Sequence, residues 1–214
     1  MIRAVVFDLD GVIADTERLQ WAAYRTVLRE LGVDVGLEEY GRHFIAGGFG
    51  PEWACRTHAL PITPDEIRAR KAPVYQALLR AGVEACPGAP AALARLRRTH
   101  RIALATNTAR SEVGFILGRL GVEALFHATV AREDYVHPKP APDAYLAAAA
   151  ALGLSPRECA VVEDTERGVR AALAAGACAI AVPNDLTVAN DFTGAARRLT
   201  HLDQLTAELL AQLG

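Results

Sequence analysis

The chain has 214 residues, of which 51% are hydrophobic and 22% are charged, and its formal net charge is −2. This length suits one large domain, or a core with a modest insertion. The near-neutral charge and the lack of a basic run argue against a nucleic-acid-binding protein or a polybasic membrane-surface protein. No apolar run reaches transmembrane length, no leader segment is visible, and the four cysteines lack metal or redox spacing. We therefore expect a cytoplasmic protein. As a separate expectation, the protein is a monomer or a weak dimer.

The first part of the chain predicts one strand followed by helices only. Residues 3–7 form a short apolar run rich in β-branched residues, which is typical of a buried strand. The next segment, 16–84, contains helical periodicity and no good strand pattern. Helices are expected there at residues 16–31, 37–46, 52–59 and 64–80.

The rest of the chain alternates between strands and helices. Strands are expected at residues 101–106, 128–130, 159–162 and 178–182, and helices at 89–97, 111–120, 142–152, 167–175 and 202–213. This alternation predicts an α/β fold, a doubly wound parallel sheet of the Rossmann-like kind, with right-handed crossovers. The helical block interrupts the alternation. We therefore expect a core of residues 1–15 and 85–214, with an α-helical cap inserted at 16–84.

Two carboxylates stand at the end of the first predicted strand. Asp8 and Asp10 are two residues apart, so in an extended chain they lie on the same side, and Gly11 lets the backbone turn sharply. Asp-x-Asp-Gly is also compatible with a plain polar turn. The apolar residues that follow at 12–14 argue against a surface turn. Paired carboxylates are expected where a cation lies between them, or where they divide nucleophile and acid–base roles.

Three other predicted strand ends or loops carry polar groups. Thr106 ends the second predicted strand and Asn107 follows it, where they would bind a ligand or cap the next helix. Lys139 stands between two prolines on a stiff backbone, although most such lysines are merely exposed. Glu163 and Asp164 end another strand, as helix caps or as oxygen ligands of the kind that Mg²⁺ prefers. Ligand sites in open α/β sheets lie at this carboxyl edge.

The motifs at these strand ends resemble those of the haloacid dehalogenase superfamily, in its phosphatase and phosphomutase branch with a helical cap. Residues 8–16 resemble the first motif, and Lys139 through Tyr145 resemble the third. Residues 163–176 resemble the fourth, and Thr106 matches the second. The four motifs occur in order and cover nearly all of the predicted core. Relatives that break carbon–halogen or carbon–phosphorus bonds usually lack the second Asp, so Asp10 points to phosphoryl chemistry.

The resemblance implies a Mg²⁺-dependent phosphatase acting through an aspartyl-phosphate. Asp8 is expected to be the nucleophile and Asp10 the acid and base. The phosphoryl group is expected to be bound by Leu9, Asp10, Thr106, Asn107 and Lys139. The metal is expected at Asp8, Asp10, Glu163 and Asp164, with Glu163 either a direct ligand or a supporting group. The expected substrate is a small phosphorylated metabolite such as a sugar phosphate. Phosphoglycolate and nucleotide monophosphates remain open.

Three other functions stay possible. A β-phosphoglucomutase-type enzyme shares all four motifs, but such mutases carry a His where this chain has Gln20. Their Gly-x-Ser-Arg cap element also has no clear counterpart in residues 46–51. A phospho-aspartate signalling switch would lack the helical insertion, and a non-catalytic binding relative is the last alternative. Substrate choice is expected to lie in the cap, where the best candidates are Gly47, Gly48, Phe49 and Gly50.

Overall fold

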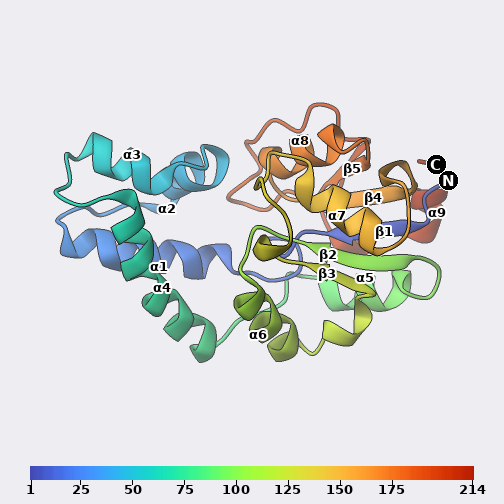
Figure 1. The fold of residues 1–214 in the computed structure, drawn as a ribbon, viewed down its shortest axis with the longest axis horizontal. Coiled ribbons are helices and arrows are strands. Elements are labelled where there is room, and N and C mark those ends of the chain that lie inside the picture. The colour runs from blue at the N-terminus through green and yellow to red at the C-terminus, as the bar shows by residue number, and fades with distance from the viewer.

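The computed structural model describes residues 1–214 and contains one six-stranded sheet. All strand pairs are parallel, in the order β3-β2-β1-β4-β5-β6. Figure 1 labels the first five strands of this order, from β3 to β5. The strands are β1 (Ala4–Phe7), β2 (Arg101–Ala105), β3 (Ala128–Val130), β4 (Cys159–Glu163), β5 (Cys178–Ala181) and β6 (Arg197–Arg198). The expected parallel α/β sheet is confirmed.

Helices cover both faces of the sheet, and the alternation of side chains along β1 shows why. Val5 and Phe7 point into one apolar cluster, which includes residues from α5, α6 and α9. Ala4 and Val6 point into the other, which includes residues from α7 and α8. Successive strand residues face opposite sides, so a strand covered on both faces reads as a continuous apolar run. The α-helices of this core are α5 (Ala89–Leu96), α6 (Arg110–Leu120), α7 (Asp143–Ala151), α8 (Glu166–Ala174) and α9 (Ala207–Ala211).

Apart from the two clusters on the faces of the sheet, a separate and smaller apolar core holds the helical insertion together. Its buried members include Val27, Leu28, Tyr40, Ile45 and Ile67. In Figure 1 this helical group lies to one side of the sheet, and the two chain termini lie at the far end. The helices are α1 (Glu17–Glu30), α2 (Leu37–Tyr40), a π-helix η1 (Gly41–Ala46), α3 (Gly50–Thr57) and α4 (Pro64–Ala81). The insertion therefore has its own packing, as an α-helical cap requires.

Backbone hydrogen bonds tie together the two chain segments that join the insertion to the core. Asp15 N donates to Glu84 O, and Cys86 N donates to Ile13 O, each at 2.9 Å. Ala14 and Ala85 form the bridge between them. The chain thus leaves the core and returns to it at one place, beside the carboxyl end of β1.

Three elements differ from the sequence expectations. The helix expected at 37–46 is α2 followed by η1. The helix expected at 202–213 is a 3₁₀ turn and the short α9, because the Thr206 side chain caps α9 by accepting from Leu209 N. Strand β6 was not predicted, since it consists of two exposed arginines with no apolar alternation. The 3₁₀ turns are η2 (Glu123–Leu125), η3 (Arg132–Asp134), η4 (Pro156–Glu158) and η5 (Leu202–Gln204).

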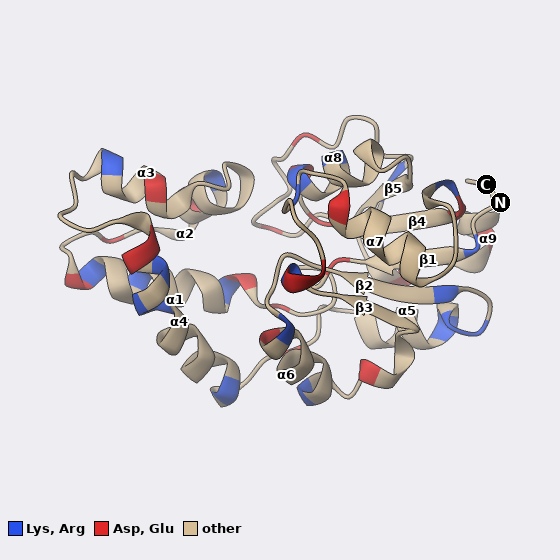
Figure 2. Ribbon diagram, viewed as in Figure 1, with Lys and Arg blue, Asp and Glu red and all other residues tan.

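Charged residues of both signs are interspersed on the core and on the insertion (Figure 2). None of the helices combines the length and the apolar character needed to cross a lipid bilayer.

Candidate active site

The carboxyl ends of β1, β2 and β4, together with the loop before α7, bring the predicted polar residues to one cavity of about 160 Å³. Parallel strands end at the same edge of a sheet, so residues far apart in sequence meet there. The core residues that line the cavity are Asp8, Asp10, Thr106, Asn107, Lys139, Glu163, Asp164, Thr165 and Arg167. All the core positions expected at the site therefore line it, except Leu9, whose side chain is fully buried.

Lys139 is the central cation of this cavity. Its ammonium group lies 2.5 Å from Asp8 Oδ1 and 2.7 Å from Glu163 Oε1, and it donates to Ala105 O at 2.9 Å. The side chain is only 6% exposed. Burial by itself would lower the pKa of Lys139, but the charges of Asp8 and Glu163 raise it above its ordinary value. Lys139 is therefore a fixed positive charge and not the exposed loop lysine that the sequence left possible.

Asp8 is the carboxylate that Lys139 contacts most closely. Burial raises the pKa of Asp8 to about 8, and the charges of Glu163 and Asp10 act in the same direction. The Lys139 ammonium opposes the rise. A divalent cation beside Asp8 would act in the same sense as Lys139 and favour the ionised form, which is the form that a nucleophile needs.

Asp10 lines the same cavity, but three hydroxyl groups hold its carboxylate. Thr16 donates to Oδ1, while Thr108 and Thr106 donate to Oδ2 at 2.5 and 3.4 Å. Thr16 and Thr108 were not assigned a role from the sequence. The Asp10 carboxylate therefore accepts from hydroxyl groups, whereas Asp8, two residues earlier, accepts from the Lys139 ammonium.

The turn after Asp10 requires glycine. Gly11 has a φ of +76°, and a Cβ there would lie 2.3 Å from Asp164 Oδ2. No side chain fits between the turn and Asp164, so the absence of a Cβ at Gly11 lets the ends of β1 and β4 approach each other.

Asp8 and Asp164 offer oxygen atoms suited to a metal ion. Ligand atoms of Asp8, Glu163 and Asp164 lie within 4.8 Å of one another. Asp164 Oδ1 is buried and has no hydrogen-bond partner, while Oδ2 accepts from Asn184 Nδ2 at 2.8 Å. Burial raises the pKa of Asp164 well above its usual range. A buried carboxylate oxygen without a partner is costly, and a hard cation such as Mg²⁺ would satisfy it.

Glu163 differs from its neighbour because protein groups occupy both of its oxygens. Oε1 accepts from Lys139 and from the Tyr145 hydroxyl, and Oε2 accepts from Thr165 Oγ1 at 3.1 Å. Gly168 packs directly against this carboxylate, where a Cβ would lie 1.8 Å from its Cδ. These contacts favour Glu163 as a group that supports Lys139 over Glu163 as a direct ligand.

The loop after β2 is tied to the Lys139 loop. Asn107 Oδ1 accepts from Lys139 N at 3.1 Å and from the Tyr135 hydroxyl at 2.7 Å. Thr108 N donates to Thr106 Oγ1 at 3.1 Å. The side chain of Asn107 is therefore structural, and its backbone amide and the Thr106 hydroxyl remain the candidate phosphoryl contacts.

The insertion closes the cavity with residues that the sequence did not single out. They are Glu17, Tyr40, Phe44 and Ile45. Glu17 Oε2 accepts from the Tyr40 hydroxyl at 2.8 Å. Burial raises the pKa of Glu17 to about 7, and the Asp10 charge adds to the rise. The only available signal was the position of Glu17 directly after the first motif.

The cap glycine segment lies elsewhere. Gly47, Gly48, Phe49 and Gly50 do not line the cavity, and Phe49 is 67% exposed. Gly48 instead contacts Arg167, whose guanidinium would lie 1.8 Å from a Cβ at that position. Arg167 also donates to Lys139 O at 2.7 Å. The segment therefore packs on a residue of the site, and its assignment to substrate binding stays a prediction.

Comparison with known proteins places these features in a family. A model of the haloacid dehalogenase-like hydrolase family matches residues 2–176. The chain is 30% identical over 184 residues to the fructose-1-phosphate phosphatase YqaB of Escherichia coli K12. This alignment covers 83% of the chain and 95% of YqaB. It is also 30% identical over 223 residues to the β-phosphoglucomutase of Bacillus subtilis. That alignment covers 98% of this chain and 94% of the mutase.

Solved structures agree with this assignment. CbbY from Rhodobacter sphaeroides, in complex with phosphate, superimposes with a TM-score of 0.80 at 30% identity, over 96% of each chain. The matched region includes the strand ends and the helical insertion described above. The chain therefore belongs to the haloacid dehalogenase-like hydrolase family.

Proposed function

We propose that the protein is a Mg²⁺-dependent phosphatase that hydrolyses a small sugar phosphate through an aspartyl-phosphate at Asp8. The observation that carries the proposal is the buried contact of Asp8 with Lys139, beside the unpartnered oxygen of Asp164. Two relatives whose names describe phosphatases support it. Residues 16–84 would act as the cap over residues 1–15 and 85–214, and the cytoplasm is the proposed location.

Asp8 would attack the phosphorus atom of the ester. A bond forms between an Asp8 oxygen and phosphorus, the bond to the substrate oxygen breaks, and Asp10 gives its proton to the departing alcohol. Water then attacks the phosphorus atom and gives a proton to Asp10. The bond between the Asp8 oxygen and phosphorus breaks, so phosphate is released and Asp8 is regenerated. Thr106 and the backbone amide of Asn107 would hold the phosphoryl oxygens.

The charges of the site suit this reaction. Attack of a carboxylate on a phosphate dianion brings like charges together, at a cost of about 4 kcal/mol per charge pair at ~4 Å and an effective dielectric constant of ~20. That amounts to roughly a thousandfold in rate. Lys139 opposes this repulsion from one side. Bound Mg²⁺, held by Asp8, the Asp10 carbonyl and Asp164, with Glu163 in support, would supply further positive charge.

The lining of the cavity favours a leaving group that carries hydroxyls. Glu17 and Tyr40 offer a carboxylate and a phenol to it, and a carboxylate accepts hydrogen bonds from hydroxyl groups. The cations that line the cavity are Lys139, which two carboxylates contact, and Arg167, which donates to the backbone oxygen of Lys139. A leaving group with a second phosphate or a carboxylate would place a further negative charge beside Glu17 whenever Glu17 is ionised. We therefore favour a sugar monophosphate over phosphoglycolate.

A phosphomutase is the second candidate, because the β-phosphoglucomutase of Bacillus subtilis covers nearly the whole chain. Gln20 stands where such mutases are expected to carry a His, which favours hydrolysis.

Release of inorganic phosphate from a panel of metabolites tests the proposal. The panel contains aldose and ketose monophosphates, a sugar bisphosphate, phosphoglycolate and a nucleotide monophosphate, each with Mg²⁺ and with excess EDTA. We expect release from a sugar monophosphate that EDTA abolishes. Release unaffected by complete metal removal would contradict the metal site. No release, together with conversion of β-glucose 1-phosphate to the 6-phosphate when a bisphosphate activator is present, would identify a mutase.

A further inference from the structure

The loop after β5 contacts both the proposed metal site and the cap. Its residues Asn184, Asp185 and Leu186 each contact a different part of the protein. Asn184 donates to Asp164, and the carboxylate of Asp185 accepts from Arg18 of α1. Leu186 packs against the apolar core of the insertion, and its carbonyl oxygen would lie 3.2 Å from a Cβ at Gly41.

The amide of Asn184 is fixed at both of its ends. Its Oδ1 accepts from Leu186 N at 2.9 Å, so its Nδ2 is the atom that faces Asp164 Oδ2. Asn184 N also donates to the fully buried Thr187 at 3.0 Å. A reversed amide would place an oxygen against the Asp164 carboxylate and an NH₂ group against Leu186 N. The loop therefore dictates which end of the amide Asp164 meets.

This contact decides which oxygen of Asp164 is free. Because Asn184 occupies Oδ2, the buried Oδ1 is left without a protein partner. Groups that hydrogen-bond to a metal ligand orient it, and their loss typically weakens metal binding by 10- to 100-fold.

We propose that Asn184 is a positioning residue that turns Asp164 Oδ1 toward the metal, and that Leu186 links this orientation to the cap. The proposal rests on the metal-dependent function proposed above. A shift of η1 at Gly41 would move Leu186. Since Leu186 N is bonded to the Asn184 side chain, the shift would also move the amide that holds Asp164. Coupling of this kind is reciprocal, so metal binding would in turn favour one placement of the cap.

Isothermal titration calorimetry of the substrate-free protein with Mg²⁺ tests the positioning role of Asn184. We expect Asn184→Ala to weaken Mg²⁺ binding about tenfold or more. Asn184→Ser, whose side chain is too short to bridge to Asp164, should behave in the same way and serves if the alanine variant does not fold. The matched control is Asn190→Ala, because Asn190 lies on the same segment and accepts from Glu166 N without touching a site carboxylate. Wild-type affinity in a folded Asn184 variant would overturn the positioning role.

The link to the cap is tested with Leu186→Ala. This variant leaves the Asn184 amide and the carboxylates of the site in place, yet it should weaken Mg²⁺ binding about threefold or more. Leu146→Ala, at an exposed leucine of α7, should leave the affinity unchanged. Equal affinities for Leu186→Ala and wild type would overturn the link. Failure of the wild-type protein to bind Mg²⁺ would overturn the metal-dependent function itself, and this inference with it.

Discussion

Lys139 Nζ lies 2.5 Å from Asp8 Oδ1, in a place where both side chains are almost fully buried. The two residues are 131 positions apart in the chain, and the cavity around them is lined by the ends of three strands. A second carboxylate, that of Glu163, is 2.7 Å from the same nitrogen. The Lys139 ammonium is therefore shared between two buried carboxyl groups.

Lys139→Met should destabilise the protein strongly. The substitution leaves two buried carboxylates without their cation, and breaking a buried ion pair from one side typically costs about 3–5 kcal/mol. Urea unfolding of metal-free protein measures the loss. Arg3→Met is the control, because its exposed ion pair with Glu158 is worth at most about 1 kcal/mol. Equal losses in the two variants would contradict the account of Lys139.

Gly11→Ala should harm the site beyond its backbone strain. The φ of +76° disfavours a side chain, and the new Cβ would also overlap Asp164. Gly32→Ala separates the two effects, because Gly32 has a φ of +80° and nothing within 4 Å of its Cβ position. We expect about 1–3 kcal/mol of destabilisation from strain in both variants. Only Gly11→Ala should also lose Mg²⁺ binding, as titration calorimetry would show, and unchanged Mg²⁺ affinity in that variant would be inconsistent with the close packing.

Mg²⁺ affinity should rise with pH. Burial raises the pKa of Asp8 to about 8 and that of Asp164 above its usual range, so the metal-free site holds protons near neutral pH. Metal binding needs the ionised carboxylates and therefore releases these protons. Affinity should therefore increase with pH through the range in which Asp8 loses its proton, near pH 8. Calorimetry in buffers of different ionisation enthalpy counts the released protons, and binding without proton release would contradict the raised pKa values.

Glu17→Gln should change how stability depends on pH. Burial raises the pKa of Glu17 from 4.5 to about 7, although the hydrogen bond from Tyr40 opposes the rise. Between these values the folded state binds more protons than the unfolded state, so the free energy of unfolding falls as pH increases. The variant lacks this group. From pH ~4.5 to pH ~7 its free energy of unfolding should therefore fall by about 1–3 kcal/mol less than that of wild type.

Denaturant unfolding across this pH range measures the difference for Glu17→Gln. Glu38→Gln is the control, since Glu38 is exposed and pairs with Arg42. Parallel stability profiles for wild type and Glu17→Gln would show that the carboxyl titrates normally in the folded protein.

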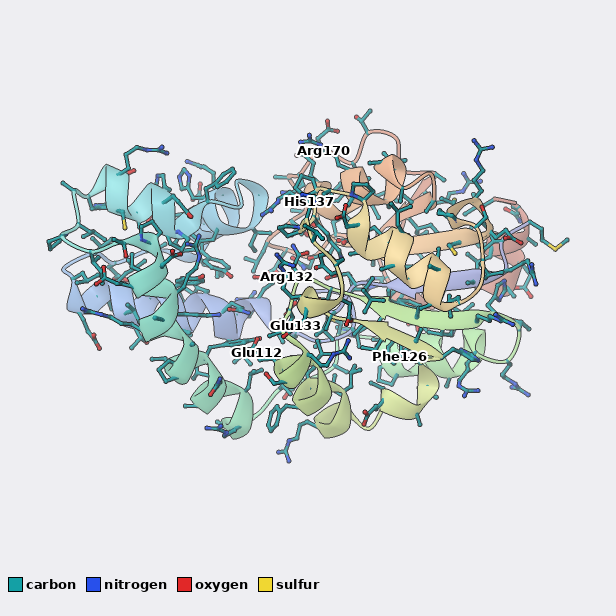
Figure 3. All side chains as sticks on the ribbon, viewed as in Figure 1. Glu112, Phe126, Arg132, Glu133, His137 and Arg170 are labelled. Atoms are coloured by element: carbon teal, nitrogen blue, oxygen red, sulfur yellow. The ribbon has the colours of Figure 1, made fainter.

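Much of the core was predictable because its signals are local. Each buried strand is a short apolar run, and each polar group of the site directly follows a strand or stands in a stiff loop. Figure 3 shows Glu112 and Glu133 on the side of the core that faces the insertion. No sequence pattern predicted which core residues face the insertion. The core and the insertion pack separately, so no apolar periodicity connects their facing surfaces.

The cap side of the cavity was not predictable. The Tyr40 hydroxyl donates to Glu17, 23 residues away in the chain, and this contact depends on how α1 and α2 pack together. Asn184 reaches Asp164 from a loop whose composition signals only a turn. The glycines at 47, 48 and 50 were the obvious breaker signal, yet none of them lines the cavity, and Gly48 packs against Arg167. Local composition marks where a chain bends but not which surface the bend meets.

The most direct test of the account is to trap the phosphoryl-enzyme. A sugar monophosphate that the protein hydrolyses is mixed with it and Mg²⁺, the reaction is quenched in acid within one turnover, and the peptide containing Asp8 is analysed by mass spectrometry. We expect one phosphoryl group on Asp8 in the wild-type protein. In Asp8→Asn we expect neither this adduct nor phosphate release. Phosphate release by wild type with no adduct on that peptide, and equal release by Asp8→Asn, would contradict it.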